Sequence, residues 1–491
     1  MNDLQRMKGQ HHDLLDRMQF LADPLADETM AKIMGDWHDL NGSGESADGA
    51  FLPSPEWQHQ WQHQWQKIAA VTKVFGDWTT NENLGTWQPQ AGLAPEITAP
   101  LLHYVAASRE LPAWADRAKM ARAEELFMDY GALSVTLLFC ASLPECYVIP
   151  DLSAVLHVTG QLEKHTDYRV RATGAMIFPV MMHGGLTDPA GGGMAQIFKV
   201  RLIHATIRNL ILRNNPERAV ANLAGDAAGV VPPLATVSDT NNMHQVLFEH
   251  GWKTGEDGLP CNQEELAYTL LTFSYVFLRG LRTLGLGFTR ADEEAYLHTW
   301  NVTGHMLGIE RVLMADTMDG AAKLFAQMKS RGRADQQDHA SDPRPALGNA
   351  LINAMKSVIP FDIFKPFPQL LTCHLVGAET SKDLGLTASV PWRSRLLFYA
   401  MLAISRAIDT IARLVWPEFS ITRFLMRILG YRLITQLMMD QTRPLKLPQH
   451  LLNRVSEMVE SWSDDKKAPN WLNSVEDRVT TRGVWSSSRP D

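Results

Sequence analysis

The sequence predicts an all-α protein in which many helices pack into a single large body. Apolar residues recur mostly at spacings of three and four residues, which is the periodicity of amphipathic helices. Runs with period two that are rich in Val, Ile and Thr are nearly absent, so few strands are expected. The 491 residues are 45% hydrophobic, and no linker is long enough to separate domains convincingly. We therefore expect one large helical core.

Three segments are expected along this body. Residues 1–110 form an N-terminal helical extension with a loop, and residues 111–440 form the main helical domain. Residues 441–491 form a C-terminal helix and tail, in which the chain beyond Trp462 is expected to be mobile.

The charge balance and the cysteines exclude several classes of protein. Lys and Arg number 46 against 54 Asp and Glu, a net charge of −8, so no general basic field exists to attract nucleic acid. Four scattered cysteines make no disulfide framework and no CxxCH site for c-type haem. The N-terminus lacks the apolar core of a secretory signal, and no stretch reaches the roughly 20 apolar residues of a membrane span. A cytoplasmic protein is expected.

A short duplication, QHQW followed directly by QHQW, predicts a helix with two different stripes. Trp57, Trp61 and Trp65 fall on one stripe, and His59 with His63 on another. A histidine pair at this spacing can bind a metal, but no third ligand lies nearby in the sequence. The pattern favours a helix that docks through its tryptophans.

The most informative helix is expected from Met194 to Arg213, after a glycine-rich turn. At 100° per residue, His204 falls within its apolar face rather than opposite it. Arg201 and Arg208 lie one turn on either side of His204. Two cations beside an imidazole in apolar surroundings predict an anionic partner at this position.

Two interpretations of that partner remain open from the residues alone. In the first, His204 hydrogen-bonds a carbonyl group, and Arg201 and Arg208 snorkel or pair with carboxylates of neighbouring helices. In the second, a buried haem takes His204 as its axial ligand while its two propionates accept charge-assisted hydrogen bonds from the arginines. Residue spacing does not choose between them.

A second helix is expected from Tyr168 to Met182. Arg169 and Thr173 share one of its faces, at i and i+4, whereas Arg171 points elsewhere. One interpretation is a surface arginine with a threonine that bonds its own backbone. The other is a polar pair that faces a cofactor pocket.

Six motifs in this order resemble the haem-b oxygenase superfamily of rubber oxygenases (latex-clearing proteins) and the fungal mycophenolic-acid-pathway oxygenase. The resemblance extends from about Leu111 to Glu310. The motifs are Leu111-Pro112-Ala113-Trp114 with Asp116, SLPECY at Ser142 to Tyr147, Thr159-Gly160 ahead of Arg169-x-x-Ala172-Thr173, Val200-Arg201-x-x-His204-Ala205-x-x-Arg208, the LPCNQEELAxTL stretch from Leu259, and WNVTGHMLG at Trp300 to Gly308.

The resemblance implies a globin-like helical core around one non-covalent haem b (iron protoporphyrin IX). By this likeness His204 is the proximal iron ligand. Arg201 and Arg208 lie near the haem edge and its propionates. Arg169 and Thr173 belong to the helix on the distal side, where the chemistry takes place.

The implied function is a haem-dependent oxygenase that uses O₂ on an apolar, unsaturated, isoprenoid-like small molecule. Rubber oxygenases carry a lysine just before the threonine, and this sequence has Ala172 there. That departure favours a smaller apolar substrate inside the cell over a rubber polymer outside it. Glu145, Asp151 and Glu163 are candidates for a general base, and none of them is assigned.

Two other functions stay open beside the oxygenase. One is a carrier that holds haem or a hydrophobic ligand without turnover. The other is a cofactor-free helical interaction protein in which His204 is merely packed. His298 and His305, seven residues apart, share a helical face and are expected to take ordinary packing roles. His183-Gly184-Gly185 lacks the GxSxG motif that a hydrolase would need.

The stretch from Arg393 to Met439 has a local excess of positive charge. It contains seven arginines but only two acidic residues, Asp409 and Glu418. A basic amphipathic surface of this kind can contact anionic lipid, which predicts a peripheral membrane contact. The alternative is that these arginines form ion pairs within the protein.

Overall fold

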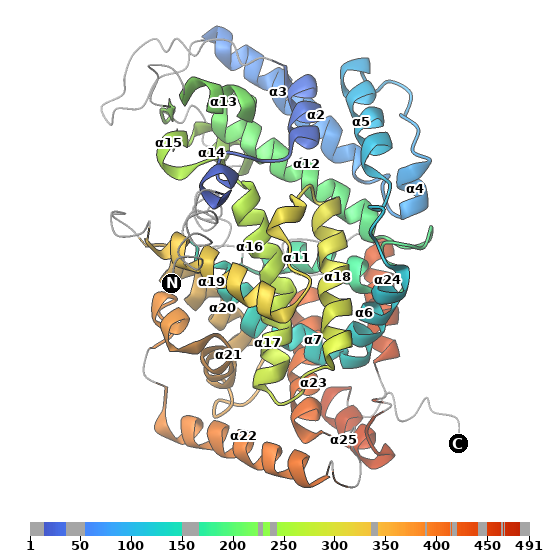
Figure 1. Cartoon of the computed structure of the whole chain (residues 1–491), viewed down its shortest axis with the longest axis vertical. Coiled ribbons are helices and arrows are strands. Elements are labelled where there is room, and N and C mark those ends of the chain that lie inside the picture. The colour runs from blue at the N-terminus through green and yellow to red at the C-terminus, as the bar shows by residue number, and fades with distance from the viewer. Residues whose placement is uncertain are drawn as a thin grey trace, which may run out of the picture.

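The computed structural model describes residues 14–35, 55–149, 166–223, 229–235, 243–334, 342–387, 390–412, 414, 420–439, 449–462, 465 and 467–481. In these residues helices dominate, and the one sheet pairs β1 (Val230–Val231) with β2 (Trp252–Lys253), antiparallel. The all-α prediction is therefore confirmed, with the helices packed into a single body (Figure 1). The expected globin-like core and the division into three segments stay predictions.

The first half of the described chain contains α2 (Pro24–Met34), α3 (Pro55–Val74), α4 (Asn81–Gly85), α5 (Pro95–Ser108), α6 (Arg117–Tyr130), α7 (Ala132–Leu137), the π-helical turn η1 (Leu138–Ser142), α8 (Leu143–Cys146), α11 (Thr166–Met181), α12 (Gly193–Leu212), α13 (Pro216–Leu223) and α14 (Met243–Glu249). The second half contains α15 (Thr254–Asp257), α16 (Gln263–Phe273), α17 (Tyr275–Thr283), α18 (Arg290–Met306), η2 (Arg311–Leu313), α19 (Met318–Ala334), α20 (Arg344–Ser357), α21 (Phe367–Asp383), α22 (Trp392–Ala412), α23 (Ile421–Leu433), η4 (Ile434–Met438), α24 (Gln449–Ser461) and α25 (Asn470–Thr480).

The centre of the body is the uncharged run through α7 and η1. All residues of both elements are buried. Helix α23 crosses α7 so closely that a Cβ built on Gly430 would lie 1.6 Å from the carbonyl oxygen of Ala132. The Thr136 hydroxyl donates to the carbonyl oxygen of Met426 over 2.8 Å at the same crossing. Glycine is required there because any side chain would separate the two helices.

Membrane crossing was tested on the described residues. No single helix among them is both long and apolar enough to span a bilayer; only the pair Arg117–Tyr130 and Ala132–Cys146, bent by 88°, reaches that length and composition together.

The tryptophan stripe docks as expected. Trp61 is buried on α3, and its ring centroid lies 5.5 Å from that of Phe248 on α14. The Trp65 ring lies 6.1 Å from the same phenylalanine. His63 is exposed, whereas Trp57 and His59 lie outside the residues whose side chains are described. The docking interpretation is confirmed for the two described tryptophans.

The chain beyond Trp462 corrects one expectation. It contains α25, in which Leu472, Asn473, Glu476 and Asp477 are buried. The Glu476 carboxylate accepts from Nε of Arg427 on α23 at 2.9 Å. Helix α25 is therefore anchored on the body by a buried ion pair and a leucine, and the prediction of a mobile tail was wrong for this helix.

Candidate functional site

The two helices that carry the predicted site residues form a hairpin. Helices α11 and α12 pack on each other, and their connection is very tight because it is rich in glycine. A Cβ built on Gly185 would lie 2.3 Å from the carbonyl oxygen of Pro179, and one on Gly193 would lie 2.9 Å from the same oxygen. The side-chain amide of Asn81 fastens the turn, since it donates to the carbonyl oxygen of Gly185 at 2.9 Å. These contacts explain the glycine-rich spacing between the two helices.

The hairpin places Arg169 at the level of His204. Pro179 on α11 lies against Gly193 on α12, so residues at equal distances from these two positions are level along antiparallel helices. At about 1.5 Å per residue, Arg169 and His204 both lie roughly 15 Å from that end. Thr173 lies about one turn nearer the hairpin connection. Two backbone positions that are 35 residues apart in sequence thus lie at similar heights along the hairpin.

Helix α12 is least covered in the middle of its predicted apolar face. Near its ends Ile197 and Ile211 are fully buried. Between them His204 is half-buried and Ile203 is 39% exposed. The expectation of a buried His204 is corrected here, because the opposite side of α12 packs more completely than the face that carries this histidine.

One side of this opening is a pocket lined by apolar residues. Ile203 and Ile207 of α12 line it together with Met30 of α2 and with Ile68 and Phe75 of α3. It contains about 340 Å³ of empty space, part of it open to solvent. The helix that carries His204 therefore borders an apolar hollow.

On α11 the accessible face is the one that was predicted to carry chemistry. Ala172 is exposed, and Thr173 and Met176 are half-buried. The side chain of Arg169 lies outside the described residues, although its backbone is part of α11. Arg171 is fully buried on a different face, where Nη1 donates to the carbonyl oxygen of Leu437 at 3.4 Å. The predicted separation of Arg171 from Thr173 is confirmed.

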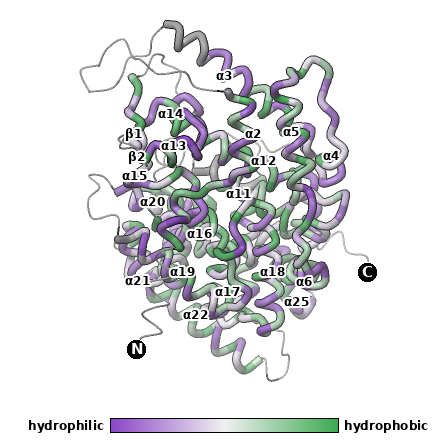
Figure 2. Tube along the Cα trace, turned by 45° about the horizontal axis from the view of Figure 1, so that its top comes forward, coloured by the Kyte–Doolittle hydropathy of each residue, from purple (hydrophilic) through white to green (hydrophobic). Residues whose placement is uncertain are grey.

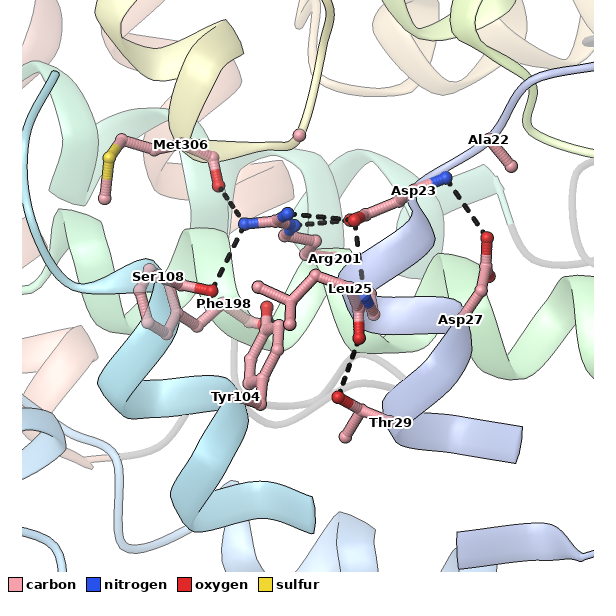
Figure 3. A network of polar contacts seen from close by, with 12 residues as sticks. Ala22, Asp23, Leu25, Asp27, Thr29, Tyr104, Ser108, Phe198, Arg201 and Met306 are labelled. Atoms are coloured by element: carbon pink, nitrogen blue, oxygen red, sulfur yellow. Dashed lines mark hydrogen bonds and ion pairs between the residues drawn. The ribbon is translucent and has the colours of Figure 1, made fainter. Parts of the chain in front are cut away.

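Arg201 is held by a carboxylate of the N-terminal helix. Its Nε and Nη2 both donate to the carboxylate of Asp23, with 2.8 Å for the Nη2 contact (Figure 3). Nη1 donates to the carbonyl oxygen of Met306 at 3.3 Å and to the Ser108 hydroxyl at 3.4 Å. Its guanidinium carbon also lies 5.8 Å from the centre of the Tyr104 ring. All three guanidinium nitrogens are therefore satisfied within the protein.

Arg208 is fully buried and has a similar partner. Its Nε donates to Oδ1 of Asp27 at 2.8 Å, and Nη1 donates to the carbonyl oxygen of Cys261 at 2.9 Å. Nη2 has no hydrogen-bond partner among the described residues. Burial raises the pKa of Asp27 above its ordinary value, and the attraction of the Arg208 cation offsets this only in part.

Asp23 and Asp27 are thus site residues that the sequence analysis missed. The arginines do pair with carboxylates of a neighbouring helix, as one of the two open interpretations held. A signal was available, because the two aspartates lie at i and i+4 and therefore share one face of a helix. Nothing in the spacing, however, indicated that residues near position 25 would meet residues near position 205.

Two of the three candidate bases lie outside the described residues, namely Asp151 and Glu163. The third, Glu145, is fully buried between two cations. Its Oε1 accepts from Arg279 and its Oε2 from Lys329, each at 2.6 Å. This carboxylate is occupied by ion pairs.

His298 and His305 pack against Trp114. Nε2 of His298 accepts from the backbone N–H of Asp116 at 2.8 Å. The rings of His298 and His305 both lie edge-on to Trp114, with centroid distances of 5.7 and 5.8 Å. His183 is exposed beside the hairpin connection. Within the described ranges, no group of three His, Cys, Asp or Glu side chains can hold a bare metal ion.

Comparison with known proteins identifies the family. The model of the family "ER-bound oxygenase mpaB/B'/Rubber oxygenase, catalytic domain" matches residues 132–407, more than half of the chain, including α11 and α12. A rubber oxygenase from Streptomyces sp. (strain K30) is 23% identical over 336 residues, which are 67% of this chain and 69% of the relative. The structure of a latex clearing protein in the closed state has a similar fold, with a TM-score of 0.52 and 18% identity over 90% of each chain. The chain belongs to the mpaB/rubber oxygenase catalytic-domain family and is an oxidoreductase of the oxygenase type.

Proposed function

We propose that this protein is a haem-b-dependent oxygenase that uses O₂ on an apolar, unsaturated, isoprenoid-like substrate, with His204 as the proximal iron ligand. The observation that carries the proposal is the half-buried His204 in the opening of the apolar face of α12, in a chain of an oxygenase family. A half-buried histidine at the centre of an apolar stripe is suited to lie beside a flat apolar ring system.

The donor set favours haem over a bare metal ion. A porphyrin supplies four nitrogen ligands to its iron, so the protein needs to contribute only one imidazole. That requirement agrees with a single histidine at this point of α12 and with the lack of a three-residue ligand cluster among the described residues. Haem supplies the binding and activation of O₂ once it is bound.

In this proposal Arg201 and Arg208 would orient α12 and would not neutralise the full negative charge of the haem propionates. Arg201 and Arg208 already balance Asp23 and Asp27, so each pair is electrically neutral. Nη2 of Arg208 is the nitrogen that still has a hydrogen bond to give, and we assign it to a propionate oxygen. Both arginines then fix the rotation of α12, and with it the direction of His204.

Helix α11 would provide the opposite wall. Thr173 places a hydroxyl on its accessible face, and the backbone of Arg169 lies about one turn further from the hairpin connection. Between them Ala172 presents only a methyl group, so this position offers no side chain to coordinate iron. Met176, half-buried on the same helix, would help to keep water away from an apolar substrate.

A carrier of haem or of a hydrophobic ligand is the second candidate, and one observation favours it. Glu145 is the one candidate base whose side chain is described, and it is bound to Arg279 and Lys329. A carboxylate in that position is poorly suited to remove a proton from a substrate.

The test is visible absorption of protein purified after expression with ample haem, together with a pyridine haemochrome assay. We expect one haem b per chain and a Soret band that His204→Ala abolishes. His63→Ala, on the exposed side of α3, is the matched control and should keep the band. Oxygen consumption with a short polyisoprene oligomer then separates the oxygenase from the carrier, which would be coloured but inactive. A colourless wild-type protein would contradict the oxygenase and the haem carrier, and would leave the carrier of a hydrophobic ligand and the cofactor-free interaction protein.

A further inference from the structure

Helix α22 is attached to the body by one narrow stripe. Its buried residues follow one another at intervals of four, four, three and four, and they are Ser394, Phe398, Leu402, Ser405 and Asp409. Such a stripe covers less than half of the circumference of a helix. In both views α22 lies along the lower edge of the molecule, so its other side faces outward (Figures 1 and 2).

The outward side of α22 is apolar, which is the reverse of an ordinary surface helix. Trp392 is 69% exposed, Leu396 62%, Ile404 59% and Ile411 68%. On a helical wheel Leu396, Ile404 and Ile411 lie opposite the buried stripe, within about one quarter of the circumference. A continuous apolar surface of this length on a folded protein indicates an interaction site.

A neighbouring loop also exposes apolar side chains. Phe361 is 63% exposed and Ile363 46%. The loop connects to α22 through a chain of ring contacts: Phe364 lies 5.1 Å from Phe367, and Phe367 lies 5.4 Å from Phe398. We call α22 and residues 361–365 together the basal face.

The exposed charges of α22 are all positive. Arg393, Arg395 and Arg406 are exposed, whereas Asp409, the one acidic residue of this helix, is buried. The Asp409 carboxylate is turned inward, where it accepts from the Ser420 hydroxyl at 2.7 Å and from the backbone N–H of Ile421 at 2.5 Å. Arg406 donates to the carbonyl oxygen of Thr283 on the body, so the basal face combines apolar side chains with the positive charges of Arg393 and Arg395 on α22.

Two other arginines of the predicted basic segment, on α23, do not contribute to this charge, and Arg413 lies outside the described residues. Arg423 pairs with Asp465 and Arg427 with Glu476, each at 2.9 Å, and both arginines are buried. The interpretation as internal ion pairs thus holds for these two residues of α23. The residues available for a membrane contact therefore lie on α22 and in the loop before α21 rather than along the whole range from Arg393 to Met439.

We propose that the basal face docks on the surface of an anionic phospholipid membrane, with α22 lying in the plane of the interface. Its apolar side chains enter the boundary between headgroups and acyl chains, and its arginines reach the lipid phosphates. Trp392, at the end of the helix, is of the residue type that settles at headgroup level. The proposal does not depend on the haem or on the reaction.

Charge favours a membrane over a second copy of the chain. An isologous dimer through this face would bring two copies of α22 together, each with Arg393 and Arg395 exposed, while Asp362, the exposed carboxylate of the loop, is already paired with Lys365. These like charges would repel, whereas an anionic membrane attracts them. An uncharged hydrocarbon surface would satisfy the apolar residues but would leave the arginines without partners.

The experiment is co-sedimentation of the full chain with phosphatidylcholine vesicles, with and without phosphatidylserine, at low and high salt. We expect binding to the anionic vesicles that is about tenfold stronger than to neutral ones and that weakens with salt. The double variant Ile404→Glu/Ile411→Glu should lose binding, and Arg393→Glu/Arg395→Glu should lose the preference for anionic vesicles. Val312→Glu, on the exposed turn η2, is the matched control, because Val312 is 55% exposed and lies far from α22 in sequence.

A second readout locates the contact without depending on those variants. The fluorescence difference between wild type and Trp392→Phe isolates one indole, and this difference spectrum should shift to the blue when anionic vesicles are added. The proposal is overturned if wild type stays in the supernatant with anionic vesicles at low salt. It is equally overturned if Ile404→Glu/Ile411→Glu binds as wild type does, if the difference spectrum does not move, or if these substitutions merely dissociate a dimer.

Discussion

The carboxylate of Asp23 receives two hydrogen bonds from the guanidinium of Arg201, although 178 residues separate the two side chains in the sequence (Figure 3). Asp23 also caps α2, because its side chain accepts from the backbone N–H of Ala26 at 3.2 Å. The Asp23 carboxylate thus caps the N-terminus of α2 and also orients α12 through Arg201. The direction of His204, one turn further along α12, depends on this contact.

Asp23→Asn tests the contact through stability. Asparagine is an equally good N-cap but leaves the Arg201 cation uncompensated in a buried site. We expect a loss of about 3 kcal/mol in the free energy of unfolding, measured by denaturant titration. Glu28→Gln, which breaks an exposed pair with Lys32 on the same helix, should have no measurable effect. Equal effects of the two variants would contradict a dominant role for the buried pair.

The Glu124 carboxyl group should make stability depend on pH. Burial raises the pKa of Glu124 to about 7, although its Oε2 accepts from the backbone N–H of Gly184 at 2.8 Å. Because the folded state keeps this proton at a higher pH than the unfolded state, stability should fall as pH rises from the unfolded value of 4.5 through 7. The expected loss is about 2 kcal/mol.

Glu124→Gln should abolish this loss, since glutamine still offers an oxygen to Gly184 but does not titrate in this range. The measurement is the unfolding midpoint in a pH series, with Glu125→Gln as the neighbouring control. A wild-type protein that gains stability from pH 5 to 7 relative to Glu124→Gln would show that the sign is wrong.

Glu145→Gln separates a structural role from a catalytic one. It removes the charge that holds Arg279 and Lys329. We expect a loss of about 3 kcal/mol in the free energy of unfolding, because two cations lose a fully buried partner. Glu294→Gln, which releases the exposed Arg290, is the control and should change little. If Glu145→Gln keeps full stability but loses turnover per folded chain, Glu145 is a base after all.

Gly430→Ala should break the crossing of α7 and α23. A Cβ at this position would overlap the carbonyl oxygen of Ala132, which belongs to the backbone and cannot rotate away. We expect a loss of about 3 kcal/mol or more, or failure to fold, judged by thermal melting and by soluble yield. Gly85→Ala in α4 meets no atom within 4 Å and should be neutral. A Gly430→Ala protein as stable as Gly85→Ala would exclude this close crossing.

Much of the site could be predicted from local sequence. The turn between α11 and α12 and the different directions of Arg171 and Thr173 follow from helical geometry and glycine placement. The docking of Trp61 and Trp65 was predictable for the same reason, since a stripe at i and i+4 has to be buried somewhere. In each case the relevant residues are close neighbours in the chain.

Other features could not be predicted from local sequence patterns. An apolar stripe predicts that one face of α12 is apolar, but not that its centre at Ile203 and His204 would be the least covered part. Likewise, the arginines of Arg393 to Met439 look alike in sequence, yet Arg423 and Arg427 are buried in ion pairs while Arg393 and Arg395 are exposed. Whether a residue is buried depends on which helices from distant parts of the sequence pack against it.

The sequence alone determined that the chain is helical, because the spacing of its apolar residues matches the helical period. Ordered motifs along the helices also indicated the oxygenase family. Tertiary structure alone decided which carboxylates neutralise Arg201 and Arg208, and which side of α22 stays uncovered. The reason is physical: periodicity is a property of neighbouring residues, whereas the partner of a buried charge is set by the packing of helices that are distant in sequence.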